Sequence, residues 1–166
     1  MNRLIRHAPL VLLAAGAFAL AAALVAEHVF GLDPCILCIY QRWPYVVVMA
    51  LAALVLLIRP APRWRAGLIA LCAVAFLSGT ALAGFHVGVE RHWWEGTDGC
   101  TAAELADPSD PAAVLAALRQ TPVVRCDEIQ WSLFGITIAG YNGLFTAALA
   151  VFSLAAAVRH ARIDPR

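Results

Sequence analysis

The chain has 166 residues, of which 62% are apolar and only 14% are charged. A soluble domain is usually about 45–50% apolar and about 25% charged, and a globule of this size has too little interior to bury the excess. The composition therefore argues against a soluble globular protein, a disordered chain and a nucleic-acid-binding protein. The net charge is only +1, but all twelve basic residues are arginines and they are unevenly placed.

Four stretches of the chain are apolar and long enough, or nearly so, to cross a membrane. A bilayer core of about 30 Å requires roughly 20 apolar residues in a helix. Within lipid, a helix is the single segment that satisfies its own backbone hydrogen bonds. We expect one membrane domain over residues 1–166, an all-α bundle of four transmembrane helices. The helices should cover about residues 8–27, 40–58, 66–89 and 136–158, the second beginning near Ile39 because its apolar stretch is short.

The arginines predict how this bundle is oriented. Eight of the twelve lie before the first span, between the second and third, or after the fourth. The positive-inside rule makes both termini and the loop of about residues 59–65 cytoplasmic, so that the loops of about residues 28–39 and 90–135 face the periplasm. The first span resembles a signal peptide, but its apolar stretch is longer than usual and we expect an uncleaved anchor.

The longer outer loop contains a typical helix start at residues 109–111. Asp110 can serve as the N-cap, and Pro111 suits the first helical position. The apolar residues that would share one face of this helix are Val114, Leu115 and Leu118. We expect the segment to lie on the membrane surface, with a plain solvated loop as the alternative.

Four of the five cysteines lie in the two outer loops. Cys35 and Cys38 form a C-x-x-C motif in the first loop, and Cys100 and Cys126 lie in the second. The periplasm is oxidising, so disulfides can form there, and the simplest arrangement joins each pair within its own loop. Other connectivities remain open. A C-x-x-C disulfide closes a very small ring and stabilises little, whereas it is typical of thiol–disulfide exchange.

Non-catalytic interpretations of these residues also exist. Both pairs could be structural staples, or a zinc site could be built from His28, Cys35, Cys38 and His92. Haem attachment is excluded because Ile39, and not histidine, follows the C-x-x-C motif. Cys72 is interpreted as a small buried apolar residue and His86 as a helix-packing residue of the third span.

The residues around Cys38 favour a reactive thiolate. A helix that begins near Cys38 places its positive dipole end at that sulfur. Arg42 follows four residues later, on the same helical face, and is always charged. Its alternative role is to reach the lipid headgroups as an anchor. Pro44 suits the first turn of a helix but would kink one that starts much earlier.

Residues 35–42, Cys-Ile-Leu-Cys-Ile-Tyr-Gln-Arg, resemble the C-x-x-C-x-x-x-R signature of the DsbB family of disulfide bond formation proteins. The second cysteine pair lies, as in that family, in the loop between the third and fourth spans. Residues 84–94 and 126–131 are also similar to the family, so that the resemblance covers essentially the whole chain. The family takes part in the quinone-linked system that keeps the bacterial periplasm oxidising.

The resemblance implies a quinone-dependent protein disulfide oxidoreductase of the bacterial inner membrane with its active site facing the periplasm. Cys100 and Cys126 would form the disulfide that reoxidises a DsbA-like thioredoxin-fold partner, whose thiolate attacks Cys100. Electrons would then pass to the first pair through an exchange between Cys35 and Cys126. Cys38 and Arg42 would contact a membrane quinone, ubiquinone or menaquinone, which leaves as quinol. No resident metal ion is expected.

Two positions depart from the family pattern. Gln41 stands where the family often has glutamate, and Arg91 directly follows Glu90 where the family has a histidine close to the quinone. His92, one position later, and Arg91 are the two candidates for that role.

Two alternatives to this interpretation remain. A vitamin K epoxide reductase type also combines a C-x-x-C motif with quinone, although its motif lies near a late helix. A non-catalytic membrane scaffold, metal-binding or disulfide-stapled, is the other.

Overall fold

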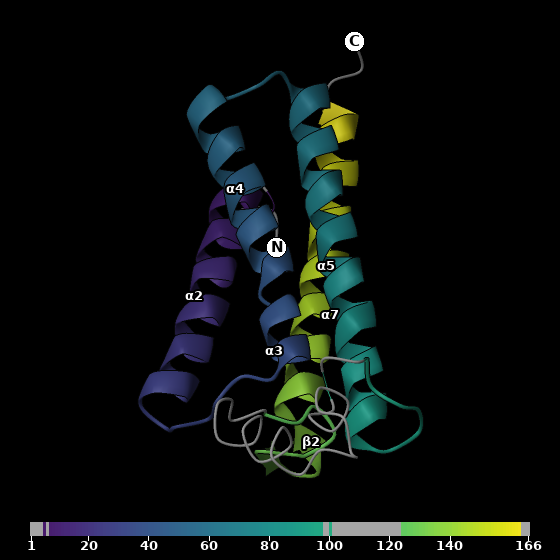
Figure 1. Cartoon of the computed structure of the whole chain (residues 1–166). Helices are drawn as coiled ribbons and strands as arrows, with labels where there is room; N and C mark the ends of the chain where they lie inside the picture. The colour runs from purple at the N-terminus through teal and green to yellow at the C-terminus, as the bar shows by residue number, and fades with distance from the viewer. Residues whose placement is uncertain (1–4, 6, 98–99, 101–123, 164–166) are drawn as a thin grey trace, which may run out of the picture.

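The computed structural model describes residues 5, 7–97, 100 and 124–163. Within them, four apolar segments are long enough to cross a membrane (Figure 1). The helices are α2 (Ala8–His28), α3 (Ile36–Tyr40) with α4 (Trp43–Ile58), α5 (Pro62–Glu90) and α7 (Ile138–Ile163). A short antiparallel hairpin, β1 (Ser132–Leu133) and β2 (Ile136–Thr137), leads directly into α7. The expected four-helix membrane fold is confirmed.

Prolines mark the first turns of three helices: Pro9 in α2, Pro44 in α4 and Pro62 in α5. The N–H groups of a first turn have no partner within the helix, so the donor that proline lacks is not missed there. In a longer helix, Pro44 would clash with the carbonyl four residues earlier, that of Tyr40. This clash explains why α3 ends at Tyr40 and α4 begins at Trp43. The helical part of this span starts at Ile36, earlier than the expected start near Ile39.

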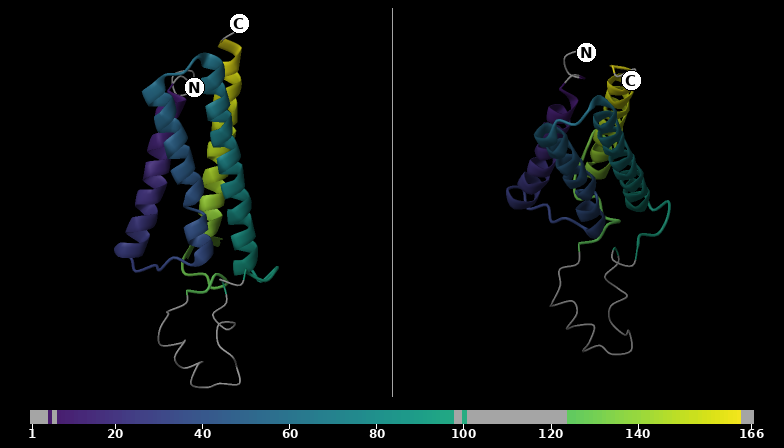
Figure 2. Two further views of the ribbon diagram at one scale, coloured as in Figure 1. Left: turned by 45° about the horizontal axis from the view of Figure 1, so that its top comes forward. Right: turned by 90° about the horizontal axis from the view of Figure 1, so that it is seen from above.

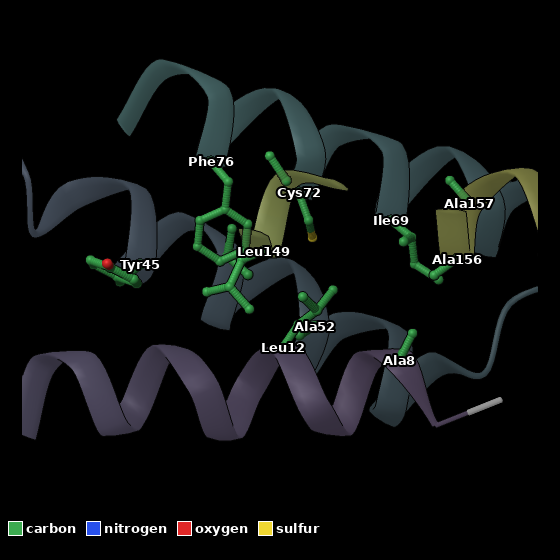
Figure 3. Close-up of a cluster of buried hydrophobic side chains, with 12 residues drawn as sticks. Ala8, Leu12, Tyr45, Ala52, Ile69, Cys72, Phe76, Leu149, Ala156 and Ala157 are labelled. Carbon is green, nitrogen blue, oxygen red and sulfur yellow. The ribbon is translucent and has the colours of Figure 1, made fainter. Parts of the chain in front are cut away.

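The helices pack around a common apolar core. The most extensive contact is between α5 and α7, and α4 packs against both α2 and α5 (Figures 1 and 2). Figure 3 shows side chains of four helices meeting there, among them Leu12, Tyr45, Phe76 and Leu149. Cys72 is buried in the same cluster, which confirms that it is a small core residue.

Large apolar side chains also cover the outside of the bundle. Leu57 is 82% exposed, Val151 71% and Phe18 68%. A monomeric soluble protein rarely exposes contiguous apolar surface on this scale. In a bilayer the same side chains face lipid tails, and the chain is therefore a multi-pass membrane protein.

The two ends of the bundle differ. The His160 ring donates a hydrogen bond to the carbonyl of Ile5 over 3.2 Å, so the beginning of α2 and the end of α7 lie together. Figure 2 shows the α4–α5 connection at this same end. The start of α3 and the β1–β2 hairpin lie at the opposite end (Figure 1). The surface helix expected around Pro111 lies outside the described residues.

Two glycines of α5 allow a matched test of packing. A Cβ at Gly88 would collide with the ring of Trp94, which stacks on Phe85. A Cβ at Gly84, one turn earlier, would meet nothing within 4 Å. We predict that Gly88→Ala destabilises the fold by about 1–3 kcal/mol, the usual cost of overpacking. Gly84→Ala should be neutral or slightly stabilising, because alanine is the better helix former.

Thermal unfolding of the two purified variants in detergent measures this difference. A lower melting temperature for Gly88→Ala alone is the expected result. Equal melting temperatures would contradict the packing of Trp94 against Gly88.

Candidate functional site

Cys35 and Cys38 come together at the start of α3. Cys35 is the N-cap of this helix, and its Sγ accepts a hydrogen bond from the backbone N–H of Cys38 over 3.3 Å. The two Sγ atoms lie 2.9 Å apart, so a small movement would bring them to the disulfide bond length of about 2.05 Å. Cys35 is buried and Cys38 half-buried. The turn therefore pairs the sulfurs and leaves Cys38 the more accessible of the two.

The surroundings of this pair favour the thiolate form of Cys35. The sequence had suggested that the helix N-terminus lies at Cys38. The helix starts at Ile36, so its N-terminus lies at Cys35 instead. The hydrogen bond with the Cys38 thiol, together with the nearby His86 imidazole, lowers the pKa of the Cys35 thiol to about 4, although burial acts in the opposite direction. The thiolate is the reactive form in exchange, so this environment favours the reactive form of Cys35.

His86 lies at the centre of the site. It projects from α5, is only 3% exposed, and places its Nε2 atom 3.6 Å from Cys35 Sγ. Glu90 Oε1 lies 4.0 Å from the same nitrogen, and the backbone of Cys126 is also within hydrogen-bonding reach of the ring. The sequence suggested a packing role for His86. The structure instead places it between the two cysteine pairs.

The second cysteine pair joins the first in one buried cluster. Cys100 and Cys126 form a disulfide over a sequence separation of 26, as the simplest arrangement predicted. Cys35 and Cys38, which that arrangement also joined, are free thiols in the structure. Cys100 and Cys126 are buried, and they pack with Cys35, Leu37 and Val89. The fold thus brings the cysteines of two separate loops into contact with the same apolar core.

A cavity of about 880 Å³ opens beside Cys38, between α2, the α3–α4 junction and α7. Most of its wall is apolar, with aromatic side chains such as Phe145 and Trp131. Its polar side chains near Cys38 include Gln41, Arg42, Tyr45 and Asn142. Sites for small molecules have this size, and they combine apolar walls with a few polar groups. The cavity therefore suits a lipophilic ring with polar substituents.

Arg42 holds an ion pair at the rim of this cavity. Its Nη2 atom lies 2.8 Å from Oε2 of Glu27, near the end of α2, and both side chains are about one quarter exposed, 26% and 27%. The pair connects α2 to the α3–α4 junction. As the sequence suggested, Arg42 lies on the same side as Cys38, since both line the cavity. Its partner Glu27 was not predicted.

A chain of hydrogen bonds leads from the cavity to His86. Tyr45 donates its hydroxyl proton to Asn142 Oδ1 over 2.5 Å, and Asn142 Nδ2 donates to Gln41 Oε1 over 2.6 Å. Gln41 Nε2 lies 2.7 Å from His86 Nδ1. Sequence reasoning did not assign Tyr45, Asn142 or His86 to the site. The available signal was their polarity, because polar side chains within apolar spans are costly and mark functional positions.

Arg91 and His92 are not brought to the cavity. Helix α5 ends at Glu90, and the chain then turns away through His92, whose backbone φ is 57°. Arg91 Nη2 donates instead to the carbonyl of Gly135 over 2.8 Å. Both residues are exposed.

Comparisons with known proteins agree with this arrangement. The family model described as disulfide bond formation protein DsbB matches residues 5–156. A disulfide bond formation protein B of Neisseria meningitidis serogroup A is 35% identical over 65% of this chain, an alignment that spans 64% of its own length. The protein of the same name from Aromatoleum aromaticum is 29% identical over 84% of this chain and 87% of its own.

An uncharacterised protein of Rickettsia prowazekii is 26% identical over 86% of this chain and 82% of its own length. No solved structure matches the chain. The family model covers all four membrane spans up to the last turns of α7, and with them both cysteine pairs. The chain therefore belongs to the DsbB family of disulfide bond formation proteins, which are membrane disulfide oxidoreductases.

Proposed function

We propose that this protein reoxidises a DsbA-like thioredoxin-fold dithiol protein in the bacterial periplasm and passes the electrons to a membrane quinone. The observation that carries this proposal is the position of Cys38, which lies 2.9 Å from the Cys35 sulfur and lines the cavity of about 880 Å³. One sulfur pair thus has access to a lipophilic acceptor. The second pair, packed in the same buried cluster, can receive electrons from the partner.

The charge distribution supports an inner-membrane location. Arg59 directly follows α4, Arg63 and Arg65 lie at the start of α5, and other arginines lie before α2 and in the last turns of α7. By the positive-inside rule this end of the bundle is cytoplasmic. The two cysteine pairs are at the other end, where the periplasm is oxidising.

In the proposed first stage, electrons enter at the second pair. A thiolate of the partner attacks Cys100, which forms a mixed disulfide and releases Cys126 as a thiolate. The second partner thiol then displaces Cys100, so that the partner leaves oxidised and both loop cysteines are reduced. The exchange needs no other reactant, but Cys100 and Cys126 are buried, so the partner has to uncover this disulfide before it attacks.

In the proposed second stage, Cys126 attacks Cys35 of the Cys35–Cys38 disulfide and releases Cys38. Cys100 resolves the new bond, which restores the Cys100–Cys126 disulfide and leaves the first pair reduced. The common cluster of Cys35 and Cys126 supports this direct exchange. His86 supports it too, since its ring lies against both Cys35 and the Cys126 backbone.

Quinone, when bound, accepts two electrons and two protons and becomes quinol. Cys38, Gln41, Arg42 and Asn142 would hold its polar head, and the apolar wall would hold its ring and tail. Arg42 stabilises negative charge beside Cys38, and the Cys35 thiolate closes the disulfide again.

A metal site is the second candidate, because one observation favours it. Cys35, Cys38 and His86 each place a ligand atom within 4.8 Å of the others. The set proposed from sequence is not assembled, since His28 and His92 are exposed and His28 bonds the Leu24 carbonyl. Elemental analysis of the purified protein distinguishes the candidates: stoichiometric zinc would favour the metal site, and its absence the redox function.

The role of Cys38 can be tested by quinone reduction. We predict that Cys38→Ser abolishes the reduction of quinone by purified protein supplied with reduced partner. Cys72→Ala is the control, because Cys72 is buried in the core away from both pairs and should retain turnover. Quinone absorbance in the ultraviolet follows the reaction. Full activity of Cys38→Ser would contradict the proposed mechanism.

The role of Arg42 can be tested in the same assay. We predict that Arg42→Ala raises the KM for quinone at least tenfold, about 1.4 kcal/mol, because the cation beside Cys38 is lost and Glu27 is left unpaired. Arg91→Ala, at an exposed residue outside the cavity, should leave this KM unchanged. If Arg42→Ala changes neither the KM nor the pH–rate profile, Arg42 is only an anchor at the membrane surface.

A further inference from the structure

The hydrogen bonds between the cavity and His86 have a definite direction. Tyr45 donates to Asn142 Oδ1, so the amide nitrogen of Asn142 faces Gln41 Oε1. The carbonyl end of Gln41 is thereby occupied, and its NH₂ group faces His86 Nδ1 over 2.7 Å. An amide has one accepting and one donating end, so the orientation of each group determines the next.

This direction determines which nitrogen of His86 carries the proton. An NH₂ group can donate only to a ring nitrogen that has a lone pair, so Nδ1 is unprotonated and the neutral ring is protonated at Nε2. The groups around Nε2 agree. Cys35 Sγ lies 3.6 Å from Nε2 and can accept a hydrogen bond from it, and the Glu90 carboxylate lies on the same side, with Oε1 at 4.0 Å.

We propose that Gln41, Asn142 and Tyr45 are positioning residues that hold His86 as the Nε2–H tautomer, so that the imidazole donates a hydrogen bond to the Cys35 sulfur. The proposal deepens the proposed function and rests on the redox role of Cys35. A neutral donor stabilises the Cys35 thiolate without adding a second positive charge near Arg42.

Because the hydrogen-bonded side chains are buried, they have no alternative partners. Gln41 is 5% exposed and His86 3%, and lipid offers no replacement hydrogen bonds. Loss of one link therefore leaves the next amide free to rotate, and the effect on His86 should weaken with distance along the chain. The titratable groups that share the small cavity beside His86 are Cys35, Cys38, Glu90, Arg125 and Glu128. Arg125 is paired with Asp127, and Glu90 accepts a hydrogen bond from Thr137.

The test measures the thiolate of Cys35 and involves no quinone. In the full-length Cys38→Ser protein, whose serine keeps a hydroxyl donor beside Cys35, the rate of alkylation by iodoacetamide is followed against pH and assigned by peptide mass spectrometry. We expect Gln41→Leu to raise the midpoint of this pH dependence, at which half of Cys35 is ionised, by at least one pH unit. Asn142→Leu should raise it less. Thr146→Val should leave the midpoint unchanged. Thr146 lies one turn further along α7, and its hydroxyl contacts Thr80 and the backbone carbonyl of Asn142, not the side-chain amides of the hydrogen-bond chain.

An unchanged midpoint in Gln41→Leu would overturn the proposal. Because no turnover is measured, this failure is distinguishable from a failure of the proposed function, which the quinone assay tests. A second measurement applies if the leucine variants do not fold. Nitrogen NMR of protein labelled at histidine should show His86 protonated at Nε2 and unprotonated at Nδ1. In Gln41→Glu, Nδ1 should become protonated. A protonated Nδ1 in the unmodified protein would overturn the proposal.

Discussion

The contact between His86 and Cys35 is the interaction on which the rest of the site depends. It joins the long helix α5 to the turn before α3, two elements that are distant in sequence. On its other side α3 stays short, because Pro44 prevents α3 and α4 from forming one helix. Since lipid supplies no hydrogen bonds, the polar groups around this contact must satisfy one another. The result is a polar cluster inside an apolar bundle.

In the proposed function, the same arrangement serves two reactants of opposite solubility. The Cys100–Cys126 disulfide, although buried, belongs to the loop end of the molecule, which a soluble protein can approach. Cys38 lines a mostly apolar cavity among the membrane helices, where a quinone can dissolve. The apolar cluster that contains Cys35 and Cys126 connects the two environments. The excess of apolar residues is thus both the scaffold of the site and the solvent of its acceptor.

The sequence predicted the spans, because length and hydropathy alone determine which segments can cross a bilayer. It also predicted that Cys38 and Arg42 belong to one site, and both line the cavity. The single helical face behind that prediction is wrong, because α3 ends at Tyr40 and α4 begins at Trp43. The sequence did not predict His86 or Asn142 at the site, because a lone polar residue in an apolar helix does not reveal how that helix is rotated against its neighbours. Arg91 was a candidate because it follows Glu90 at the position where the family has a histidine, but α5 ends one residue before it.

The most direct test of the central claim, electron exchange between the two cysteine pairs, is a cross-link within one chain. In the Cys38→Ser, Cys100→Ser double variant, Cys35 and Cys126 keep their thiols but lose their usual partners. Non-reducing peptide mapping of the air-oxidised, monomeric protein should then find a Cys35–Cys126 disulfide. If both remain thiols, or pair only between molecules, the two loops do not exchange electrons as proposed.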